Sequence, residues 1–253
     1  MENKIDYWGF QIIAGPCSVD AYESLYSTAI ELKKCGIRYL RGGAYKLRTS
    51  MHSFRGLGDA GVLYLGKVAK ELDLKSVSEC TQVDKVEFMA RNIDVLVVGT
   101  RNMYNYPLLE QMGKIDNLVI LKRGLAATYD EWLAAAEYII ESGNPNVVLC
   151  ERGIRTFETE TRYTLDISAI SVMKNKSGLP VIIDPSHAAG NRDLVPSLAS
   201  AAVAAGADGL MIESQINPCE SICDASQTID PSVLSQIIIT SALIREAINR
   251  NNK

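Results

Sequence analysis

The sequence repeats one pattern eight times: a short apolar run, a polar or glycine-rich turn, and an amphipathic stretch. The runs are rich in Val, Ile and Leu, as is typical of parallel strands buried on both faces. Eight such alternations favour a closed barrel over an open doubly wound sheet, and no GxGxxG follows the first run to indicate a dinucleotide fold. We therefore predict a single-domain (β/α)₈ TIM barrel over residues 1–253. The predicted strands cover residues 11–17, 37–43, 74–80, 94–100, 118–124, 146–153, 179–187 and 208–214.

Several amphipathic stretches carry the residues that begin and end helices. Thr128 and Glu131 have the spacing of a capping box, and Gly143 is placed to end the same helix. Asp230 and Pro231 suit the N-cap and first position of the final helix. The predicted helices include 128–143, 194–207 and 231–249.

Composition and charge exclude several classes of protein. The formal net charge of −4 argues against general nucleic-acid binding. No apolar run approaches the roughly 18 residues of a membrane span, and the N-terminal MENKIDYWGF has no secretory h-region. Six scattered cysteines without an export signal indicate reduced thiols rather than a disulfide framework. We expect a cytoplasmic enzyme that binds no membrane.

The residues that close the apolar runs are chemically active types. Barrel enzymes build their sites at the carboxyl ends of the strands, so these positions are the candidate site. Four of the eight are cationic, which in an acidic protein predicts anionic ligands such as phosphates and carboxylates. The residues are Cys17, Arg41, Glu79, Arg101, Lys122, Arg152, His187 and Glu213.

The segment RGGAYKLRTS (41–50) has the composition of a phosphate-binding loop. Cationic side chains, hydroxyl groups and the backbone N–H groups of a glycine-rich turn together suit a phosphate. A solvated basic loop is the alternative for this segment taken alone, but the cations that close other strands weigh against it. The cations and hydroxyls of the loop are Arg41, Lys46, Arg48, Thr49 and Ser50.

A second group of residues has the donor chemistry of a metal site. Cys17, His187, Glu213 and Asp224 offer a thiolate, an imidazole and two carboxylates, which suit Mn²⁺, Fe²⁺ or Zn²⁺. Taken singly, Cys17 and His187 are equally consistent with ordinary core residues. Cys219 and Cys223 are alternative ligands near Asp224, although no CxxC pair is present.

The motifs, in their order, resemble those of the 3-deoxy-D-arabino-heptulosonate 7-phosphate (DAHP) synthases. The resemblance is to the compact type I-beta branch, whose barrel is shared by the 3-deoxy-manno-octulosonate 8-phosphate (KDO8P) synthases. It spans nearly the whole chain. The matching segments are AGPCS (14–18), LRGGAYKLRTS (40–50), SFRGLG (53–58), VGTRN (98–102), LKRG (121–124), LCERGIRTFE (149–158), TRYTLD (161–166), DPSHAAGNRDLV (184–195), GADGLMIE (206–213) and DASQT (224–228).

The resemblance implies a metal-dependent condensation of phosphoenolpyruvate with erythrose 4-phosphate, the first step of the shikimate pathway to chorismate and the aromatic amino acids. It implies Mn²⁺ first, with Fe²⁺, Zn²⁺ or Co²⁺ as alternatives, and a homo-oligomer, either tetramer or dimer. Lys46 is the candidate proton donor, and Cys17 and His187 join it in the catalytic set. The implied metal ligands are Cys17, His187, Glu213 and Asp224. The implied phosphoenolpyruvate residues are Arg41, Lys46, Arg101, Lys122 and Arg152, and the aldose-phosphate residues are Arg48, Thr49 and Ser50.

The chain departs from the family pattern at two places. Lys46-Leu47-Arg48 has the spacing of the heptulosonate branch rather than the K-A-N-R of its sister, but Leu47 replaces the usual proline, so φ is no longer preset. Gln215 stands where the family commonly has histidine and cannot carry a proton. We expect this change to affect the surroundings of the metal.

Other functions remain open from the sequence alone. They are a KDO8P synthase that uses arabinose 5-phosphate, a Schiff-base aldolase with Lys122 as the amine, and a non-catalytic barrel that binds phosphosugars. The first strand begins near residue 11 and the final helix accounts for the residues after 231. We therefore expect no regulatory domain, and little feedback inhibition by aromatic amino acids unless a partner protein supplies it.

Overall fold

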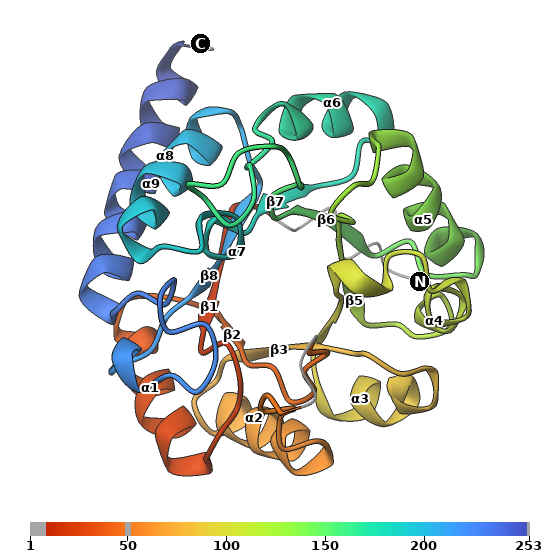
Figure 1. Cartoon of the computed structure of the whole chain (residues 1–253), viewed down its shortest axis with the longest axis vertical. Helices are drawn as coiled ribbons and strands as arrows, with labels where there is room; N and C mark the ends of the chain where they lie inside the picture. Colours follow the sequence, from red (N-terminus) through yellow and green to blue (C-terminus); the bar gives the residue numbers. More distant parts are fainter. Residues whose placement is uncertain (1–8, 49–51, 252–253) are drawn as a thin grey trace.

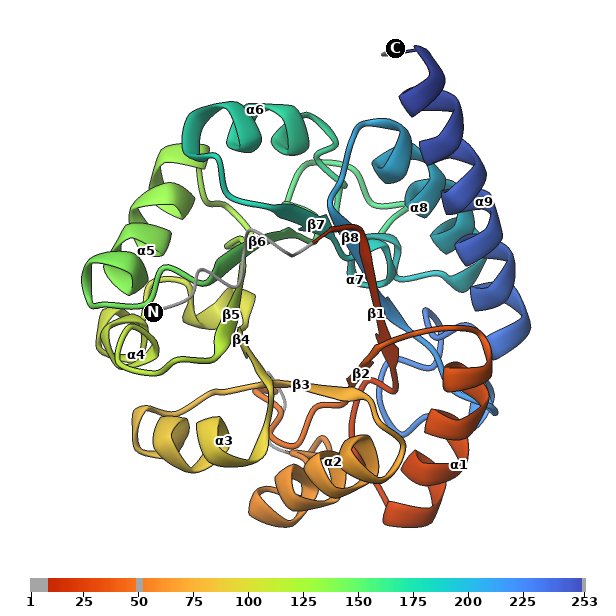
Figure 2. The same cartoon turned by 180° about the vertical axis from the view of Figure 1, so that it is seen from behind.

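The eight apolar runs form the eight parallel strands of a closed barrel in the computed structural model, which describes residues 9–48 and 52–251 (Figure 1). Consecutive strands are neighbours, and β1 pairs with β8 to close the ring. The view from behind shows the same ring from its other end (Figure 2). The predicted (β/α)₈ barrel is confirmed. Its strands are β1 (Gln11–Gly15), β2 (Tyr39–Arg41), β3 (Lys75–Glu79), β4 (Val95–Val98), β5 (Leu118–Lys122), β6 (Val147–Glu151), β7 (Val181–Ile183) and β8 (Gly209–Glu213).

Helices connect the strands and cover the outside of the barrel (Figure 1). Within the described residues they are α1 (Tyr22–Lys34), α2 (Asp59–Glu71), α3 (Val86–Asn92), α4 (Tyr106–Met112), α5 (Tyr129–Glu141), α6 (Ser168–Ser177), α7 (Pro185–Ala189), α8 (Val195–Ala204) and α9 (Pro231–Asn251), with short 3₁₀ turns η1 (Val83–Lys85), η2 (Thr100–Asn102), η3 (Arg192–Leu194) and η4 (Pro218–Glu220).

The predicted helix boundaries follow from local hydrogen bonds. Thr128 and Glu131 form the reciprocal capping box of α5, and Gly143 follows its C-cap with φ of 119°. Asp230 Oδ1 accepts from the backbone N–H of Val233 at 3.1 Å, which caps α9 beside Pro231. These side chains satisfy N–H groups that a helix start leaves without partners.

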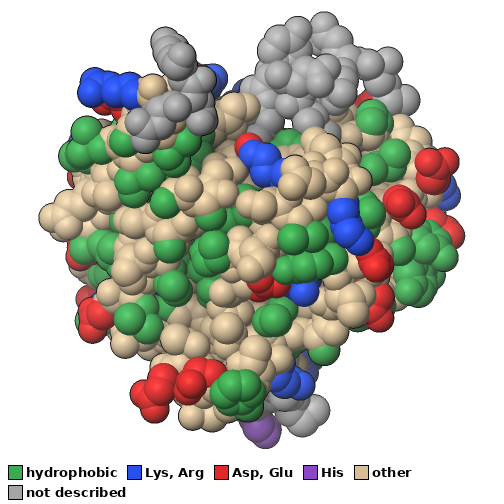
Figure 3. Space-filling model, turned by 90° about the horizontal axis from the view of Figure 1, so that it is seen from above, with side chains coloured by type: hydrophobic (Ala, Val, Ile, Leu, Met, Phe, Trp, Pro, Cys, Tyr) green, Lys and Arg blue, Asp and Glu red, His purple; other side chains and the backbone are tan. Residues whose placement is uncertain are grey.

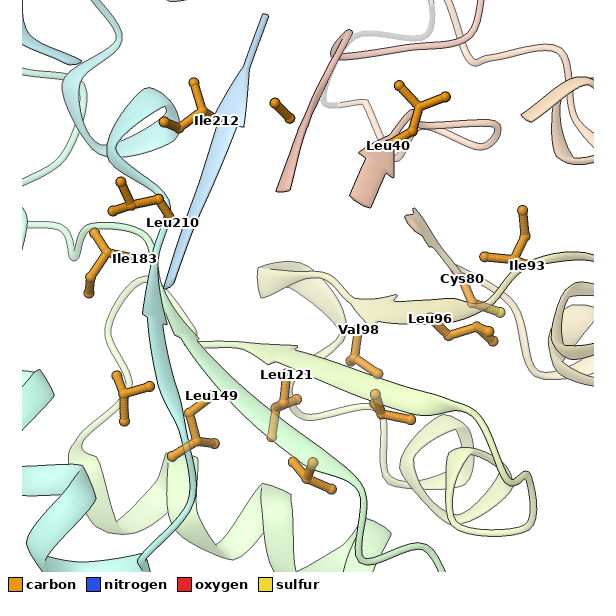
Figure 4. Close-up of a cluster of buried hydrophobic side chains, with 14 of the residues drawn as sticks. Leu40, Cys80, Ile93, Leu96, Val98, Leu121, Leu149, Ile183, Leu210 and Ile212 are labelled. Carbon is orange, nitrogen blue, oxygen red and sulfur yellow. The ribbon is translucent and has the colours of Figure 1, made fainter. Parts of the chain in front are cut away.

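The strands are buried on both faces, as their unbroken apolar runs predict. Ile120 belongs to a cluster inside the barrel, whereas its neighbour Leu121 packs in a larger cluster between the strands and the helices. Leu40, Leu96 and Leu149 belong to this outer cluster (Figure 4). Alternate side chains of a strand point to opposite faces, so each strand supplies both clusters.

The helix α9 is long and apolar enough by composition to cross a membrane, over residues 231–250. Its buried Leu234 and Ile237 lie in the same outer cluster as the core residues of α8, against which α9 packs. Ile239 and Leu243 are exposed on its other side. A side view of the barrel shows hydrophobic side chains scattered among polar and charged ones (Figure 3). We interpret α9 as the last helix of the barrel.

The seventh predicted strand, 179–187, is wrong at its carboxyl end. β7 stops at Ile183, and residues 185–189 form the short helix α7. Pro185 takes the first helical position, where it has no N–H to leave unpaired, and Asp184 caps the helix through the N–H of His187. His187 therefore lies on a helix rather than at the end of a strand.

Gly15→Ala is expected to destabilise the barrel by about 3 kcal/mol, at the upper end of the usual range for overpacking. An added Cβ would lie 2.0 Å from the Arg41 carbonyl oxygen of the neighbouring strand, so the backbones of β1 and β2 would have to separate. Urea denaturation measures the free energy of unfolding. Gly36→Ala is the matched control, because Gly36 also has positive φ but open space around it. Equal losses in the two variants would show that the close approach of the strands is unimportant.

Candidate active site

Three predicted metal ligands lie together at the mouth of the barrel. Cys17 follows β1, Glu213 ends β8, and Asp224 lies in the loop between β8 and α9. Their donor atoms all lie within 4.8 Å of one another, and Cys17 Sγ donates to Asp224 Oδ2 at 3.3 Å. The closing pair of strands places Gly15 opposite Glu213, which brings the carboxyl ends of the first and last strands side by side. One thiol and two carboxylates at this spacing fit a borderline divalent ion.

His187, the fourth predicted ligand, lies beside this triad. Its Nε2 is 3.4 Å from Glu213 Oε1 and 4.0 Å from Asp224 Oδ2. Its Nδ1 is 2.7 Å from Asp184 Oδ2, on the other side of the ring. Burial lowers the pKa of His187, which favours the neutral imidazole that can bind a metal. The fold thus brings all four predicted ligands together.

The two carboxylates of the cluster are ionised at neutral pH. Burial alone would raise the pKa of Asp224, but in the acidic range where this group titrates the charges of protonated His187 and of Arg162 outweigh burial and lower the value to about 2. Burial opposes ionisation of Glu213 as well, yet His187 and Arg41 hold its pKa below the ordinary value. Two ionised carboxylates in a buried pocket attract a cation.

The thiols near this cluster differ in character. A hydrogen bond with Cys223, together with burial and the charge of Glu213, raises the pKa of Cys17 well above its ordinary value. The same hydrogen bond is the largest cause that lowers the pKa of Cys223 to about 6. Cys219 is exposed. Of the two alternative ligands, only Cys223 therefore contacts Cys17. All six cysteines lie in the described ranges and are free thiols.

Two predicted phosphoenolpyruvate residues are bonded to metal-cluster residues. Arg41, at the end of β2, donates from Nη2 to Glu213 Oε1 at 3.1 Å. Lys46 donates from Nζ to the sulfur of Cys17 at 2.9 Å and to its carbonyl oxygen at 3.0 Å. Burial alone would lower the pKa of Lys46, but Cys17 and Glu213 raise it above its ordinary value. Its ammonium is therefore protonated and lies against the metal cluster.

The other three predicted phosphoenolpyruvate residues lie around the same opening. Lys122 ends β5, and its Nζ lies 2.5 Å from Asp184 Oδ2. Arg152 follows β6 and stacks on the ring of Tyr163, 4.4 Å from its centroid. Arg101 is exposed on the η2 turn after β4. These residues line one hollow together with His187 and Asp224.

Several buried donors in this region have no protein partner. In the described part of the chain, six buried side-chain atoms have no hydrogen bond, and four of them belong to Arg41 (Nη1), Thr100 (Oγ1) and Arg152 (Nε and Nη1). A buried donor without an acceptor costs about 1–3 kcal/mol, and more when it is charged. Such donors at a cation-lined opening are suited to the oxygens of an anion.

The predicted aldose-phosphate residues are described only in part. Arg48 and Leu47 line the same hollow as the phosphoenolpyruvate cations. Thr49 and Ser50 lie outside the described residues. Their predicted role therefore stays a prediction.

Two polar residues that the sequence did not single out also contact the cluster. Arg162 donates from Nη1 to Asp224 Oδ1 at 3.3 Å, and Gln227 donates to Glu213 Oε2 at 2.6 Å. Both fall in segments that carried the family resemblance, TRYTLD and DASQT, and this was the available signal. The amide of Gln215 donates instead to the Asn217 carbonyl, at 2.8 Å. Gln227, rather than Gln215, therefore supports a proposed ligand.

Comparison with known proteins relates this chain to a family of enzymes. The model of the DAHP synthetase I family matches residues 8–249. A phospho-2-dehydro-3-deoxyheptonate aldolase from Thermotoga maritima is 43% identical over 245 residues, which cover 97% of this chain and 72% of that protein. A 2-dehydro-3-deoxyphosphooctonate aldolase from Desulfosudis oleivorans is 28% identical, over 93% of this chain and 90% of that protein.

Solved structures agree with the sequence relatives. The crystal structure of the Thermotoga maritima DAHP synthase matches with a TM-score of 0.91 and 43% identity, over 94% of this chain and 70% of that one. A truncated form of the enzyme from the same organism matches with a TM-score of 0.87 and 41% identity, over 94% and 87% of the two chains. The matched portion in both cases includes nearly the whole of this barrel.

Proposed function

Because this chain belongs to the DAHP synthetase I family, we propose that its barrel mouth condenses phosphoenolpyruvate with erythrose 4-phosphate and one water molecule to give DAHP and phosphate. The enzyme is a transferase, and its reaction is the first step of the shikimate pathway. The relative at 43% identity carries the heptulosonate activity in its name, whereas the octulosonate relative reaches 28%. The heptulosonate reaction is therefore favoured over its sister.

One observation within the chain supports this function most strongly. Buried arginine nitrogens without partners, on Arg41 and Arg152, lie around the same barrel mouth as the donor atoms of Cys17, Glu213 and Asp224. Anion-binding cations beside a metal-capable cluster are what a reaction between two phosphorylated substrates needs. The cations offset the repulsion between the substrates and hold them in contact.

The substrate subsites follow from the positions of the cations. Arg41, Lys46, Arg101, Lys122 and Arg152 would bind the phosphate and carboxylate of phosphoenolpyruvate, supported by the hollow that most of them line. The loop that begins at Arg48 would receive the phosphate of erythrose 4-phosphate, with Thr49 and Ser50 as its hydroxyl donors. Guanidinium groups suit both because they bind phosphate and carboxylate in pairs of hydrogen bonds.

Cys17, His187, Glu213 and Asp224 would hold a divalent metal, with Mn²⁺ as the first choice and Fe²⁺, Zn²⁺ or Co²⁺ as alternatives. The donor set fits such an ion, because the thiol and two ionised carboxylates lie within 4.8 Å of one another and the neutral imidazole of His187 lies beside both carboxylates. When bound, the metal supplies Lewis-acid polarisation of the aldehyde oxygen.

Lys46 is the proposed proton donor to the oxygen that develops negative charge as the new C–C bond forms. Its raised pKa keeps the ammonium protonated, and its Nζ contacts Cys17 Sγ, so it lies within reach of both subsites. Lys122 is less suited to act as a Schiff-base amine, because its Nζ is paired with Asp184 at 2.5 Å. A paired ammonium has no free electron pair for attack on a carbonyl.

The activity itself is tested by phosphate release. The purified protein is mixed with phosphoenolpyruvate and either erythrose 4-phosphate or arabinose 5-phosphate in parallel. We expect release with erythrose 4-phosphate to be faster by about tenfold or more. About tenfold is the lower end of the discrimination between substrates that differ by one carbon unit. Faster release with arabinose 5-phosphate would assign the sister activity, and no release with either would leave only a phosphosugar-binding barrel.

Removal of metal is expected to abolish turnover, and Mn²⁺ is expected to restore it. The donor atoms of Cys17, Glu213 and Asp224 lie close enough together to hold one ion, and the Lewis-acid chemistry proposed there depends on that ion. The measurement is the initial rate after exhaustive chelation, followed by addition of each candidate ion separately. Full activity of the metal-free protein would remove the metal from the mechanism.

Assembly, location and regulation belong to the same proposal. We infer a cytoplasmic homo-oligomer, a tetramer or a dimer, that takes small-molecule substrates and binds neither nucleic acid nor membrane. Sedimentation of the purified protein tests its assembly. The same activity assay, with millimolar phenylalanine or tyrosine added, tests the expectation of weak feedback inhibition.

A further inference from the structure

Asp184 lies beneath the site, between the proposed metal ligand His187 and the proposed phosphoenolpyruvate residue Lys122. Its side chain has no exposed surface. Asp184 is the single residue between β7 and α7, where it is the N-cap of the helix. A buried carboxylate is costly unless other groups neutralise and hydrogen-bond it. Its contacts therefore indicate what it does.

The two oxygens of Asp184 make three contacts. Oδ1 accepts from the backbone N–H of His187 at 3.0 Å, which caps α7. Oδ2 lies 2.7 Å from Nδ1 of the same histidine and 2.5 Å from Nζ of Lys122. One oxygen thus touches a residue from each of the two proposed subsites.

The contact with His187 sets the direction of its ring. When Nδ1 donates its proton to a carboxylate, the unprotonated Nε2 is left to bind a metal, and it becomes a stronger donor. Nε2 faces Glu213 Oε1 at 3.4 Å, inside the proposed metal cluster. The backbone contact fixes the turn of α7 that carries the ring. Asp184 therefore hydrogen-bonds both the backbone and the side chain of His187.

The contact with Lys122 stabilises a buried ammonium group through an ion pair. The Lys122 side chain is only 10% exposed and lines the hollow that also contains Arg152. Asp184 neutralises its ammonium in the absence of an anion. When an anion binds Lys122, the positive charge of the ammonium is shared between that anion and Asp184. The negative charge of Asp184 is then less fully neutralised.

We propose that Asp184 is a positioning residue that couples the metal ligand His187 to the phosphoenolpyruvate residue Lys122, so that a change at either subsite alters affinity at the other. The inference rests on the proposed function for the identity of the two subsites. The sign of the coupling follows from the charges of the three groups. A carboxylate less neutralised by Lys122 accepts more strongly from His187, so the histidine binds metal more tightly. Such coupling is reciprocal.

The test is a titration of metal-free protein with Mn²⁺ alone, followed by calorimetry, which does not depend on turnover. Asp184→Asn is expected to weaken Mn²⁺ binding by about 10- to 100-fold, as for other groups that support a metal ligand. Lys122→Met is expected to tighten it. The Lys122→Met effect should shrink in the Asp184→Asn background, whereas a direct effect of the lysine charge on the metal would be the same in both.

Arg152→Met is the matched control. It removes another buried cation from the same opening, and its described contact is with Tyr163 rather than with Asp184. Its effect on Mn²⁺ binding should be equal in the two backgrounds. Circular dichroism and thermal unfolding establish that each variant is folded.

A measurement on the unaltered protein covers the case in which Asp184→Asn fails to fold. The chain has two histidines, His52 and His187, so nitrogen-15 NMR can resolve the ring of His187. The proton should sit on Nδ1 of the neutral ring, and a proton on Nε2 would overturn the inference. Unchanged Mn²⁺ affinity in Asp184→Asn, or additive effects of the two substitutions, would also overturn it. Failure of the unaltered protein to bind Mn²⁺ would overturn the proposed metal centre and this inference together.

Discussion

Cys17→Ala is expected to lose tightly bound metal and to lower turnover by about 10³-fold. Lewis-acid stabilisation of the transition state is worth several kcal/mol, and each 1.36 kcal/mol is about tenfold in rate. The thiol lies with Glu213 and Asp224 in the cluster whose donor atoms are within 4.8 Å of one another, so its removal leaves an incomplete ligand set. Metal content after dialysis and the steady-state rate measure the two effects.

Cys150→Ala is the matched control for this change. Both thiols are fully buried, but Cys150 points into the apolar cluster inside the barrel, where burial raises its pKa to about 12. It should lose stability and keep its metal. A Cys17→Ala protein that retained metal and rate would remove Cys17 from the proposed ligands.

Metal binding to the unaltered protein is expected to strengthen as pH rises. The pKa of Cys17 lies well above its ordinary value in the metal-free protein, so the thiol is protonated at neutral pH and must lose its proton when it binds metal. One released proton gives a rise in affinity of about tenfold per pH unit. In Cys17→Ala this slope should fall, and an unchanged slope would assign the proton to another ligand.

Lys46→Met is expected to reduce turnover by about 10³-fold, the middle of the range for loss of a positioned proton donor. Methionine keeps an unbranched apolar side chain but removes the ammonium that contacts Cys17 Sγ. Mn²⁺ should still bind, because all four proposed ligands remain. Single-turnover rates and a Mn²⁺ titration separate the two properties.

The control for Lys46→Met is Lys176→Met on the outer helix α6. Lys176 pairs with Asp130 on the surface, and its loss should leave turnover unchanged. A Lys46→Met protein with loss of metal rather than of rate would show that this lysine supports the metal cluster. Full activity in that variant would remove Lys46 as proton donor.

Local structure was predictable wherever neighbouring residues decide it. The capping box of Thr128 and Glu131 depends on groups three residues apart, and it forms as expected. The end of β7 was not predicted correctly, because the predicted strand was extended past Ile183 to His187, whereas Pro185 begins α7. Asp184 caps that helix through His187, three residues away, but its buried contact with Lys122 joins two separate strand–helix units. No local pattern indicates the contact with Lys122.

The sequence by itself determined the class of fold and the chemical types in the site. Eight apolar runs with turns and amphipathic stretches fit a parallel barrel, and a parallel barrel gathers the residues that follow its strands at one mouth. The tertiary structure alone decided which of those residues touch. Closure of β1 on β8 brings Cys17 to Asp224 across 207 positions of the chain. The physical reason is that contact depends on strand register and loop path, whereas the one-dimensional pattern specifies only which residues are buried and which are charged.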